Sequence, residues 1–511
     1  MLRSSRIKFA RDASWGRTVL TDKIKVIHFV GIGGAGVSAL AYWALKSGFT
    51  VTGSDLNSSE IITKLTSEGA RISTGGHHRR NVSTADMVVY STAINPDENV
   101  ETQEGYRRKI PVVSRIDFLA YLVRTNRGIV ISGAHGKSTT SALIAHVLKV
   151  AELKPSFAIG ACLKNPNRPE ELGNAGVGKS DLFICEGDES NSGHQELKSW
   201  VAVVTNIDDD HLDHYGSLSS IQQSFIRFIE KSKEDGAVVA CVDCPRVRGL
   251  LKQVEGRRII TYGLSSEADY RAERITPRGF DTEFVVVHRS RGELGEIRLP
   301  SPGRHNVQNA LAAVAVAEFC GVDFQQIAYG LETFPGLKRR FDILHQSDEI
   351  MVVDDYAHHP TEICALIETT RQRTDLRLRV VFQPHRFTRS KGLAKRFAPC
   401  FEPADEVILT DIYSAGEEPE DGMDKDYLAS FFEEYHQENQ SYDYRYIGNL
   451  DEIALYLIET VRPGDLILTV GAGDVFQVAK RVAEALDSQK MREKLTVEYF
   501  PTKRAEGGLF D

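Results

Sequence analysis

The sequence predicts an α/β protein with three consecutive domains, each built on a mostly parallel sheet covered by helices. Short apolar runs alternate with stretches of helical periodicity along nearly the whole chain, which is typical of parallel strands joined by helices. The chain has 511 residues, more than one ordinary hydrophobic core contains. The alternation restarts near Arg127 and near Glu349, so we expect Rossmann-like first and third domains around a central domain of another type.

The places where the alternation restarts set the expected domain boundaries. We assign residues 22–124 to the first domain, 125–336 to the central domain and 337–488 to the third, with a tail at 489–511. Residues 1–21 are basic and almost free of acidic side chains. That composition resembles a transit peptide, but a disordered leader is the simpler interpretation.

The overall composition argues against several classes of protein. The hydrophobic fraction of 41% and the charged fraction of 26% are those of a globular chain. A net charge of −9 argues against a dedicated nucleic-acid-binding protein, which normally carries a basic domain. The sequence has no long apolar run and no secretory leader, so we expect a cytoplasmic protein without membrane insertion. Seven scattered cysteines predict no disulfide framework.

The first domain opens with a glycine fingerprint between a strand and a helix. In "KVIHFVGIGGAGVSALA" the glycines have GxGxxG spacing, and an aspartate ends the next strand about twenty residues later. Such a loop lets a diphosphate approach the backbone at a helix N-terminus, and the carboxylate can accept hydrogen bonds from a ribose. The spacing alone does not distinguish NAD from other nucleotides. The predicted contacts are Gly31, Gly33, Gly34, Ala35, Gly36 and Asp55.

The central domain begins with "RGIVISGAHGKSTTSALIAHVLKV", an apolar strand, a tight loop and an amphipathic helix. The loop departs from the full phosphate-binding pattern because Ile131 stands where the first glycine is expected. In such a loop Lys137 can reach a terminal phosphate, and a hydroxyl of the following residues can ligate Mg²⁺. A plain strand-to-helix turn is the alternative. We expect a P-loop-type ATPase domain whose loop contacts are Gly133, Ala134, His135, Gly136, Lys137, Ser138 and Thr139.

Two further strands of the central domain end in acidic residues. "DLFICEGDES" delivers Glu186, Asp188 and Glu189, and "VAVVTNIDDDHLDHY" places Asn206 and His211 after its apolar run. Ligands bind at the carboxyl ends of parallel strands, so these ends beside the lysine loop predict a Mg²⁺ and triphosphate site. Within the acidic run, we interpret Asp208 and Asp209 individually as a solvated turn.

Basic side chains gather in two motifs of the third domain. They are Lys338, Arg339 and Arg340 in "GLKRRFD" and His385, Arg386 and Arg389 in "FQPHRFTRS". The planar guanidinium fork suits carboxylate and phosphoryl groups, although surface arginines are more often simply solvated. Before these motifs, "GRHNVQNALAA" places His305 and Asn309 one helical turn apart, where both can face the same ligand.

The order of these motifs resembles that of the Mur ligases, the ATP-dependent amide-forming enzymes of peptidoglycan precursor synthesis. The shared motifs are "GAHGKSTT", "EGDES", "NIDDDHLDHY", "GRHNVQNALAA", "GLKRRF", "DDYAHHPTE" and "QPHRFTR". With "HFVGIGGAGVSALA" in front of them, the chain is most similar to the alanine-adding branch of that family. The similarity extends from about Lys23 to Lys480, essentially the whole chain.

The resemblance implies a reaction and its participants. A Mur ligase of this branch joins L-alanine to the carboxylate of UDP-N-acetylmuramate through an acyl phosphate, and releases ADP and phosphate. The implied cofactors are ATP and Mg²⁺, with Mn²⁺ as a possible substitute. The implied partners are these small molecules and no nucleic acid, and the chain is expected to be a monomer or a homodimer.

The resemblance also implies roles for individual residues. For catalysis these are Lys137, Glu186, His211 and Arg340, and for metal binding Ser138, Glu186 and His211. For ATP they are the lysine loop together with His305, Asn309, Arg340 and Asp355. For the amino-acid end they are Tyr356, His358, His385, Arg386 and Arg389.

Several residues depart from the family pattern or narrow it. This branch usually has threonine at Ala134 and Ser138, alanine at Gly187 and aspartate at Asn191. Ser138 keeps the hydroxyl, and the differences at Gly187 and Asn191 bear on substrate fit more than on metal binding. Mur ligases that add later amino acids carry a carbamylated lysine where Phe225 stands here. Phe225 therefore favours the alanine-adding branch or its relative that ligates recycled L-Ala-γ-D-Glu-meso-diaminopimelate. The alternatives from other classes are an NAD-dependent dehydrogenase and a nucleotide-binding regulatory protein.

Overall fold

The computed structural model of the chain describes residues 23–164, 172–190, 192–210, 212–418 and 425–499. The chain divides into two compact units. The first unit comprises Met1–Ile275, Phe284–Leu299 and Asn306–Pro335, and the second comprises Thr276–Glu283, Pro300–His305 and Gly336–Asp511.

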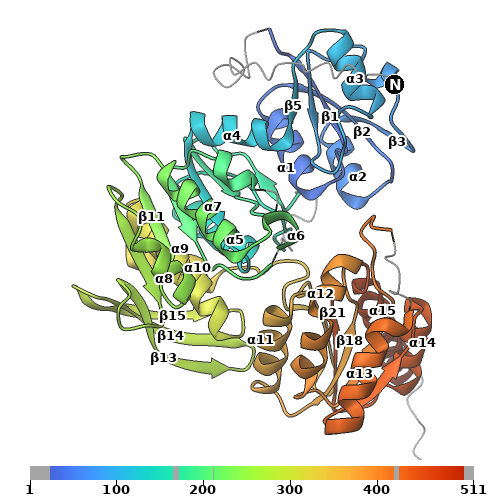
Figure 1. Cartoon of the computed structure of the whole chain (residues 1–511). Coiled ribbons are helices and arrows are strands. Elements are labelled where there is room, and N and C mark those ends of the chain that lie inside the picture. The colour runs from blue at the N-terminus through green and yellow to red at the C-terminus, as the bar shows by residue number, and fades with distance from the viewer. Residues whose placement is uncertain (1–22, 165–171, 191, 211, 419–424, 500–511) are drawn as a thin grey trace, which may run out of the picture. The chain divides into compact units, whose positions relative to one another are not determined.

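The first sheet lies in the first unit and has β1 at its centre (Figure 1). Its order is β3-β2-β1-β4-β5, and every neighbouring pair runs parallel. The strands are β1 (Val26–Val30), β2 (Thr50–Asp55), β3 (Arg71–Thr74), β4 (Met87–Tyr90) and β5 (Val112–Ser114). The helices are α1 (Ala35–Lys46), α2 (Glu60–Ser67), α3 (Val100–Arg107) and α4 (Arg115–Thr125), with the 3₁₀ turn η2 (Arg79–Val82). Because β2 and β4 lie on opposite sides of β1, the sheet has a topological switch point of the kind that binds ligands.

Polar side chains cap the N-termini of three of the four helices around the first sheet. Ser59, Asn99 and Ser114 each accept a backbone amide at the start of α2, α3 and α4. The N-cap of α1 is Gly34, and no side chain caps that end. The start of α1 therefore has backbone amides that a ligand could use.

The second sheet is the largest among the described residues and lies in the first unit, except for residues 276–278 and 281–283 of two of its strands, which belong to the second unit. Its order is β15-β14-β13-β12-β11-β10-β6-β9-β7-β8, and β6 and β10 are parallel neighbours near its middle. The strands are β6 (Arg127–Ser132), β7 (Ser156–Ala158), β8 (Ala175–Gly176), β9 (Leu182–Glu186), β10 (Val201–Val204), β11 (Ala237–Cys241), β12 (Ile259–Gly263), β13 (Tyr270–Arg278), β14 (Asp281–His288) and β15 (Gly292–Leu299). The helices are α5 (Lys137–Val150), α6 (Leu212–Tyr215), α7 (Leu218–Glu230), α8 (Pro245–Leu251), α9 (Arg304–Phe319) and α10 (Phe324–Glu332), with η3 (Gly193–Glu196).

The third sheet forms the core of the second unit. Its order is β16-β17-β21-β18-β19-β20, and all neighbours are parallel except β16 and β17. The strands are β16 (Asp342–Gln346), β17 (Met351–Asp355), β18 (Arg377–Phe382), β19 (Glu406–Leu409), β20 (Asp443–Tyr446) and β21 (Asp465–Val470). The helices are α11 (Pro360–Arg371), α12 (Phe387–Phe397), α13 (Lys425–Asn439), α14 (Leu450–Thr460) and α15 (Phe476–Tyr499), with η4 (Ala398–Phe401). The predicted α/β class with three successive, mostly parallel sheets is thus confirmed, and the first two sheets share one unit.

The expectation about cysteines was wrong for one pair. Cys364 of α11 and Cys400 of η4 form a disulfide, with their Cα atoms 4.5 Å apart and a sequence separation of 36. The pairing depends on α11 and η4 being packed together, which no local cysteine spacing reveals. Cysteine counting therefore missed a link that tertiary structure creates.

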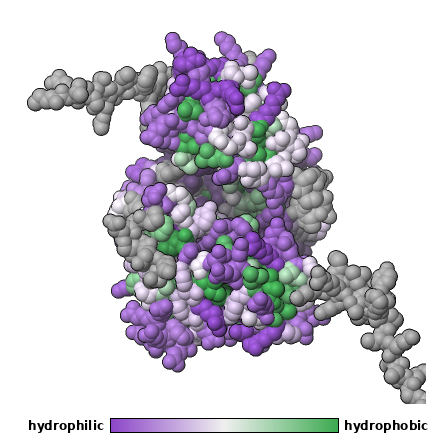
Figure 2. All heavy atoms as spheres, turned by 90° about the vertical axis from the view of Figure 1, so that its right-hand side faces the viewer, coloured by the Kyte–Doolittle hydropathy of each residue, from purple (hydrophilic) through white to green (hydrophobic). Residues whose placement is uncertain are grey.

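The surface is mainly hydrophilic on the face drawn in Figure 2, with hydrophobic residues in small groups between the polar ones. Leu56 and Leu455 are among the large hydrophobic side chains that are exposed. None of the helices in the described part of the chain is both long enough and apolar enough to cross a bilayer.

Candidate active site

The glycine loop between β1 and α1 is held by the end of the neighbouring strand β2. The amides of Gly31 and Ile32 donate to the Ser54 carbonyl at 2.9 and 3.1 Å. The amide of Gly33 donates to Asp55 Oδ2 at 2.8 Å. A Cβ at Gly33 would lie 3.0 Å from that carboxylate oxygen, so a side chain there would push the loop and the aspartate apart. Asp55 therefore shapes the predicted diphosphate loop, and its role toward a ribose stays a prediction.

The glycine loop also contacts the central part of the first unit. A Cβ at Gly36 would lie 2.7 Å from Nη1 of Arg115, and the same guanidinium donates to Asp188 Oδ2 at 3.3 Å. The Ala35 carbonyl accepts a hydrogen bond from Asn174 Nδ2 at 2.9 Å. Side chains thus link the glycine loop to Asn174 and, through Arg115, to the acidic segment after β9 within one compact unit.

The lysine loop between β6 and α5 is packed so closely that glycine is required twice. Gly133 has φ of +146° and a Cβ there would lie 2.0 Å from Thr205 Oγ1. Gly136 has φ of +81°, and its Cβ would lie 2.6 Å from Asn309 Oδ1. Asn309 also accepts a hydrogen bond from Thr140 Oγ1 at 3.1 Å, so this predicted ATP residue does lie beside the loop. A glycine loop leading directly into a helix start is the geometry that binds phosphate through backbone amides.

Lys137 is folded back onto its own loop and onto a buried carboxylate. Its ammonium donates to the Gly133 carbonyl at 2.6 Å, to the Ala134 carbonyl at 3.2 Å and to Glu189 Oε1 at 2.8 Å. Burial acts to lower the pKa of Lys137, but Glu189 outweighs it, and the pKa lies above its ordinary value. Burial raises the pKa of Glu189 to about 7. Sequence reasoning noted Glu189 at a strand end but gave it no role, and the structure places it on the predicted catalytic lysine.

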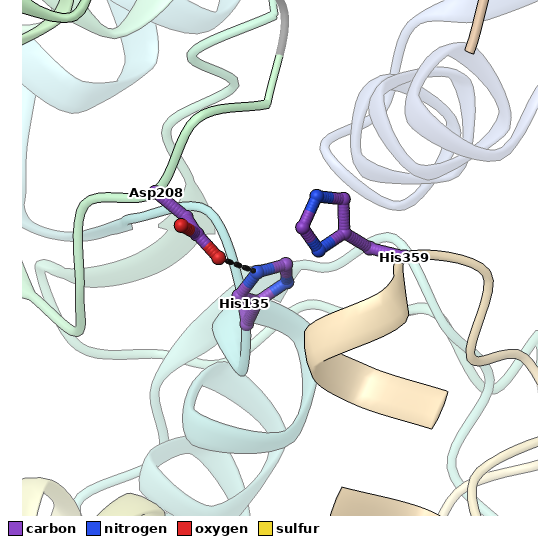
Figure 3. Close-up of side chains that lie close together, drawn as sticks. All are labelled: His135, Asp208 and His359. Carbon is purple, nitrogen blue, oxygen red and sulfur yellow. Dashed lines mark hydrogen bonds and ion pairs between the residues drawn. The ribbon is translucent and has the colours of Figure 1, made fainter. Parts of the chain in front are cut away.

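His135 in the lysine loop is held by the strand end after β10 (Figure 3). Its amide donates to Asn206 Oδ1 at 2.8 Å, and its ring Nε2 lies 3.0 Å from Asp208 Oδ2. Arg246 donates to the other oxygen of Asp208 at 2.9 Å. Burial opposes ionisation of Asp208, but the hydrogen bonds from these groups prevail and hold its pKa below the ordinary value. The solvated-turn interpretation is therefore wrong for Asp208, which is half-buried and anchors the loop. His359, also drawn in Figure 3, belongs to the second unit, where it caps α11.

Two of the three predicted metal ligands, Ser138 and Glu186, lie within the described residues. Ser138 and Thr139 lie in the first turn of α5, and Glu186 ends β9, which pairs with β6 so that Glu186 stands opposite Ile131. The Glu186 carboxylate accepts the Gly160 amide at 2.5 Å. Hydroxyl and carboxylate oxygens are the ligands that Mg²⁺ prefers, so Ser138 and Glu186 fit that ion chemically. His211, the third predicted ligand, lies outside the described residues.

In the second unit, Asp355 at the end of β17 organises the turn that carries Arg340. Its carboxylate accepts the Phe341 amide at 2.7 Å and the Ala357 amide at 2.8 Å. Burial raises the pKa of Asp355 to about 6. The Arg340 guanidinium lies 5.0 Å from the centre of the Tyr356 ring. Three residues predicted for ATP and amino acid therefore lie together.

The remaining predicted amino-acid residues form an aromatic and basic group at the starts of α11 and α12. The rings of His358 and His385 are 5.8 Å apart, and His385 stacks on Tyr413 at 5.6 Å. Burial lowers the pKa of His385 to about 4, with a further contribution from Arg389, whose guanidinium lies 3.3 Å from the His385 ring. Arg386 is bonded instead to Glu417 Oε1 at 2.5 Å.

The comparisons with known protein families cover all three α/β series. The "Mur ligase family, catalytic domain" matches residues 26–127, the "Mur ligase middle domain" matches 131–317, and the "Mur ligase, glutamate ligase domain" matches 339–473. A protein of Geotalea uraniireducens named UDP-N-acetylmuramate–L-alanine ligase is 42% identical over 464 residues, covering 91% of this chain and 98% of its own. The chain belongs to the Mur ligase family.

Relatives and solved structures of Mur ligases agree with that assignment. A Pelotomaculum thermopropionicum protein, also named UDP-N-acetylmuramate–L-alanine ligase, is 42% identical over 92% of this chain and 100% of its own length. The crystal structure of a Thermotoga maritima UDP-N-acetylmuramate-alanine ligase matches with a TM-score of 0.76 at 28% identity, covering 91% of this chain and 99% of that one. A murein peptide ligase from Psychrobacter arcticus has the same fold, with a TM-score of 0.67 at 24% identity over 90% of this chain and 98% of that one.

Two features of this Mur ligase escaped sequence reasoning in its second unit. Tyr413 and Glu417 follow β19 and contact His385 and Arg386 at the predicted amino-acid end. No motif marks them, and the only available signal was that β19, like β18, ends at the carboxyl edge of a parallel sheet.

His305 was predicted for ATP, and it lies exposed near the start of α9.

Proposed function

We propose that this Mur ligase joins L-alanine to the carboxylate of UDP-N-acetylmuramate with consumption of ATP, giving UDP-N-acetylmuramoyl-L-alanine, ADP and phosphate. The observation that carries the proposal is the lysine loop, where Lys137, two tightly packed glycines and Asn309 meet beside strand-end carboxylates. The names of relatives at 42% identity support the alanine substrate. We place the reaction in the cytoplasm, as expected from the sequence.

The chemistry proposed for the lysine loop is phosphoryl transfer followed by amide formation. The muramoyl carboxylate attacks the γ-phosphate of ATP to form an acyl phosphate, and the amine of L-alanine then displaces phosphate through a tetrahedral intermediate. Lys137 would leave its loop carbonyls and Glu189 to neutralise charge on the transferring group. Ser138 and Glu186, with His211, would hold Mg²⁺, which when bound neutralises further phosphate charge.

The choice of the alanine-adding branch rests partly on Phe225. The side chain of Phe225 is 1% exposed, and its ring lies 4.9 Å from that of His194. An apolar ring packed at this position leaves no ammonium to carbamylate, which argues against the Mur ligases that add later amino acids. The recycling ligase that uses L-Ala-γ-D-Glu-meso-diaminopimelate remains the second candidate, because Phe225 does not separate it from the alanine-adding branch.

An assay of ADP release decides between these two candidates. Purified protein is given ATP, Mg²⁺ and UDP-N-acetylmuramate, with L-alanine in one series and the tripeptide in the other. We expect turnover that needs L-alanine and the UDP-sugar together, with less than a tenth of that rate for the tripeptide. A preference for the tripeptide would assign the recycling reaction, and ADP release independent of either amine would contradict a ligase.

For the amino-acid end we propose Arg389 and Arg386 as the groups that take the alanine carboxylate, with Tyr356, His358 and His385 around them. Both arginines lie at the start of α12, and a guanidinium fork suits a carboxylate. Arg386 would have to exchange Glu417 for the substrate. Arg389→Ala and Arg386→Ala should each raise the KM for L-alanine strongly while the KM for ATP changes little. Lys395→Ala, at an exposed position of the same helix, is the matched control, and unchanged alanine dependence in both arginine variants would misplace this site.

A further inference from the structure

A fully buried carboxylate sits behind the glycine loop and joins four parts of the first domain. Glu101, in the first turn of α3, has no exposed surface. Its Oε1 accepts the His78 amide at 3.0 Å and Asn81 Nδ2 at 2.7 Å. Its Oε2 accepts the Ser54 hydroxyl at 2.5 Å and lies 3.2 Å from Nε2 of His28. We call this group the Glu101 hub: Glu101, His28, Ser54, His78 and Asn81.

The Glu101 hub is connected directly to the residues that hold the glycine loop. Ser54 uses its hydroxyl for Glu101, while its carbonyl accepts the amides of Gly31 and Ile32. Asp55, the next residue, accepts the Gly33 amide. At the end of β2, the Ser54 carbonyl therefore holds the glycine loop, while the Ser54 hydroxyl is held by Glu101.

The hub also anchors the loop that follows β3. The His78 amide and Asn81 bind the same carboxylate oxygen, and the His77 ring lies 2.9 Å from the Ser54 hydroxyl. This loop leaves β3 and the glycine loop leaves β1, the two strands on either side of β2, and both loops lie at the carboxyl edge of one parallel sheet. That edge at the switch point of the sheet is where an α/β domain binds its ligand.

We propose that Glu101 is a positioning residue for the UDP-linked substrate, an inference that rests on the function proposed above. Glu101 has no surface with which to touch a ligand, so it acts through Ser54, which sets the glycine-loop amides, and through Asn81, which sets the loop after β3. A diphosphate needs several amides to point at one place, and small displacements of the loop weaken that convergence. The expected signature is weaker binding of the UDP-sugar with ATP binding intact.

The chemistry of the hub favours a positioning role over simple packing. Burial acts to raise the pKa of Glu101, but hydrogen bonds from His28 and Ser54 outweigh it and hold the pKa at about 2. Packing alone is served at least as well by apolar side chains, since burying a charge carries a desolvation cost. A carboxylate instead offers two oxygens that can fix donors from several segments at once. Four donors from three separate segments use that capacity here.

Glutamine is a conservative replacement that this geometry accommodates. With its carbonyl oxygen toward the His78 amide and Asn81, the glutamine NH₂ group would face Ser54 and His28. The serine hydroxyl and the imidazole can both accept a hydrogen bond, whereas the backbone amide of His78 can only donate. Glu101→Gln should therefore keep the hub, while Glu101→Ala leaves buried donors unpaired.

The test is calorimetric titration of UDP-N-acetylmuramate into the full chain, with the KM for ATP measured alongside. We expect Glu101→Ala to raise the Kd for the UDP-sugar at least about tenfold, Asn81→Ala to raise it about threefold, and Glu101→Gln to stay near the parent value. The KM for ATP should be unchanged in all three variants. If Glu101→Ala does not fold, Asn81→Ala still tests the proposal, because Asn81 is only half-buried.

Glu406→Ala is the matched control for the loss of a buried carboxylate. Glu406 is 1% exposed and accepts from Arg379 in the second unit, far along the chain from the glycine loop. Glu406→Ala should lower the melting temperature without changing the Kd for the UDP-sugar. The positioning role would be overturned if Asn81→Ala had the parent Kd for the UDP-sugar. It would also be overturned if the variants raised the KM for ATP as much as the Kd for the UDP-sugar. Failure of the parent protein to bind UDP-N-acetylmuramate would instead contradict the proposed function itself.

Discussion

The glycine loop and the lysine loop of the first unit are built on one plan and differ in the charge that they carry. Each leaves a central parallel strand, turns through glycines and enters a helix. Each is held by the end of an adjacent strand: Ser54 and Asp55 bind the amides of one loop, and Asn206 binds two amides of the other. The lysine loop alone contains an ammonium, which lies against its own carbonyls and Glu189.

That difference separates a recognition loop from a loop equipped for group transfer. A diphosphate that only has to be bound is satisfied by backbone amides at a helix start. A phosphoryl group that moves between oxygens gains most from a positive charge where negative charge develops. Glycine fingerprints of similar appearance therefore predict different chemistry once the side chains inside the loop are compared.

The largest expected effect comes from removing the ammonium. Lys137→Met should lower turnover by about 10²–10³-fold, because one preorganised charge at the transferring group is lost. The fold should survive, since Lys137 is the first residue of α5 and is not part of the hydrophobic core. Steady-state ADP release and thermal denaturation check both parts.

Lys149→Met is the matched control for Lys137→Met. It replaces an exposed lysine in the last turn of the same helix. Its turnover should equal that of the parent. Near-normal turnover in Lys137→Met would mean that the loop is only a strand-to-helix turn, and the comparison of the two loops would lose its basis.

The next largest effect tests how tightly each loop is packed. Gly136→Ala meets Asn309 Oδ1 at 2.6 Å in a left-handed conformation that costs a non-glycine residue about 1–3 kcal/mol. Gly34→Ala in the glycine loop would meet only the Gly31 carbonyl, at 3.5 Å. We expect a higher KM for ATP and a lower melting temperature in Gly136→Ala, and near-parent values in Gly34→Ala. Equal tolerance at both positions would contradict the close packing of the lysine loop.

The parts of the fold that depend on local pattern were predictable. The runs before Gly31 and Gly133 and the helices after them have the periodicity of strand, loop and helix, and the structure has them as predicted. Asn309 could also be placed beside the lysine loop, although 169 residues separate it from Thr140. That prediction came from the family resemblance, because no local signal connects the two segments.

The contacts that depend on which strands are neighbours were not predictable from local pattern. Glu189 meets Lys137 because β9 pairs with β6, across 52 residues of sequence. Asp208 was misinterpreted because Arg246, which binds it, lies 38 residues later. From the sequence, Glu101 is an ordinary glutamate in the first turn of a helix. Its role depends on contacts with β1, β2 and the loop after β3, which only the folded structure shows. Long-range pairing, and not residue type, decides these roles.

A smaller effect should separate the substrates of the two loops. Asp55→Ala removes the acceptor of the Gly33 amide and should raise the KM for UDP-N-acetylmuramate about tenfold, as expected for one charged hydrogen bond. Asn206→Ala removes the acceptor of the His135 amide and should raise the KM for ATP instead. Initial-rate measurements with each substrate varied in turn give both values. If both variants raised the same KM, the two loops would not bind different substrates.

The smallest expected effect concerns the acid sensitivity of the lysine-loop anchor. Asp208 has a pKa below its ordinary value in the folded protein, so below about pH 4 the unfolded state takes up a proton that the folded state resists. The stability that Asp208 contributes is therefore present above about pH 4 and is lost as the pH falls. Asp208→Asn cannot titrate, so it should be less stable than the parent at pH 7 by about 1 kcal/mol, with the difference shrinking toward pH 3. Urea denaturation of both proteins between pH 3 and pH 7 measures this difference, and parallel curves over the whole range would show that the bonds of Asp208 to His135 and Arg246 do not stabilise the loop.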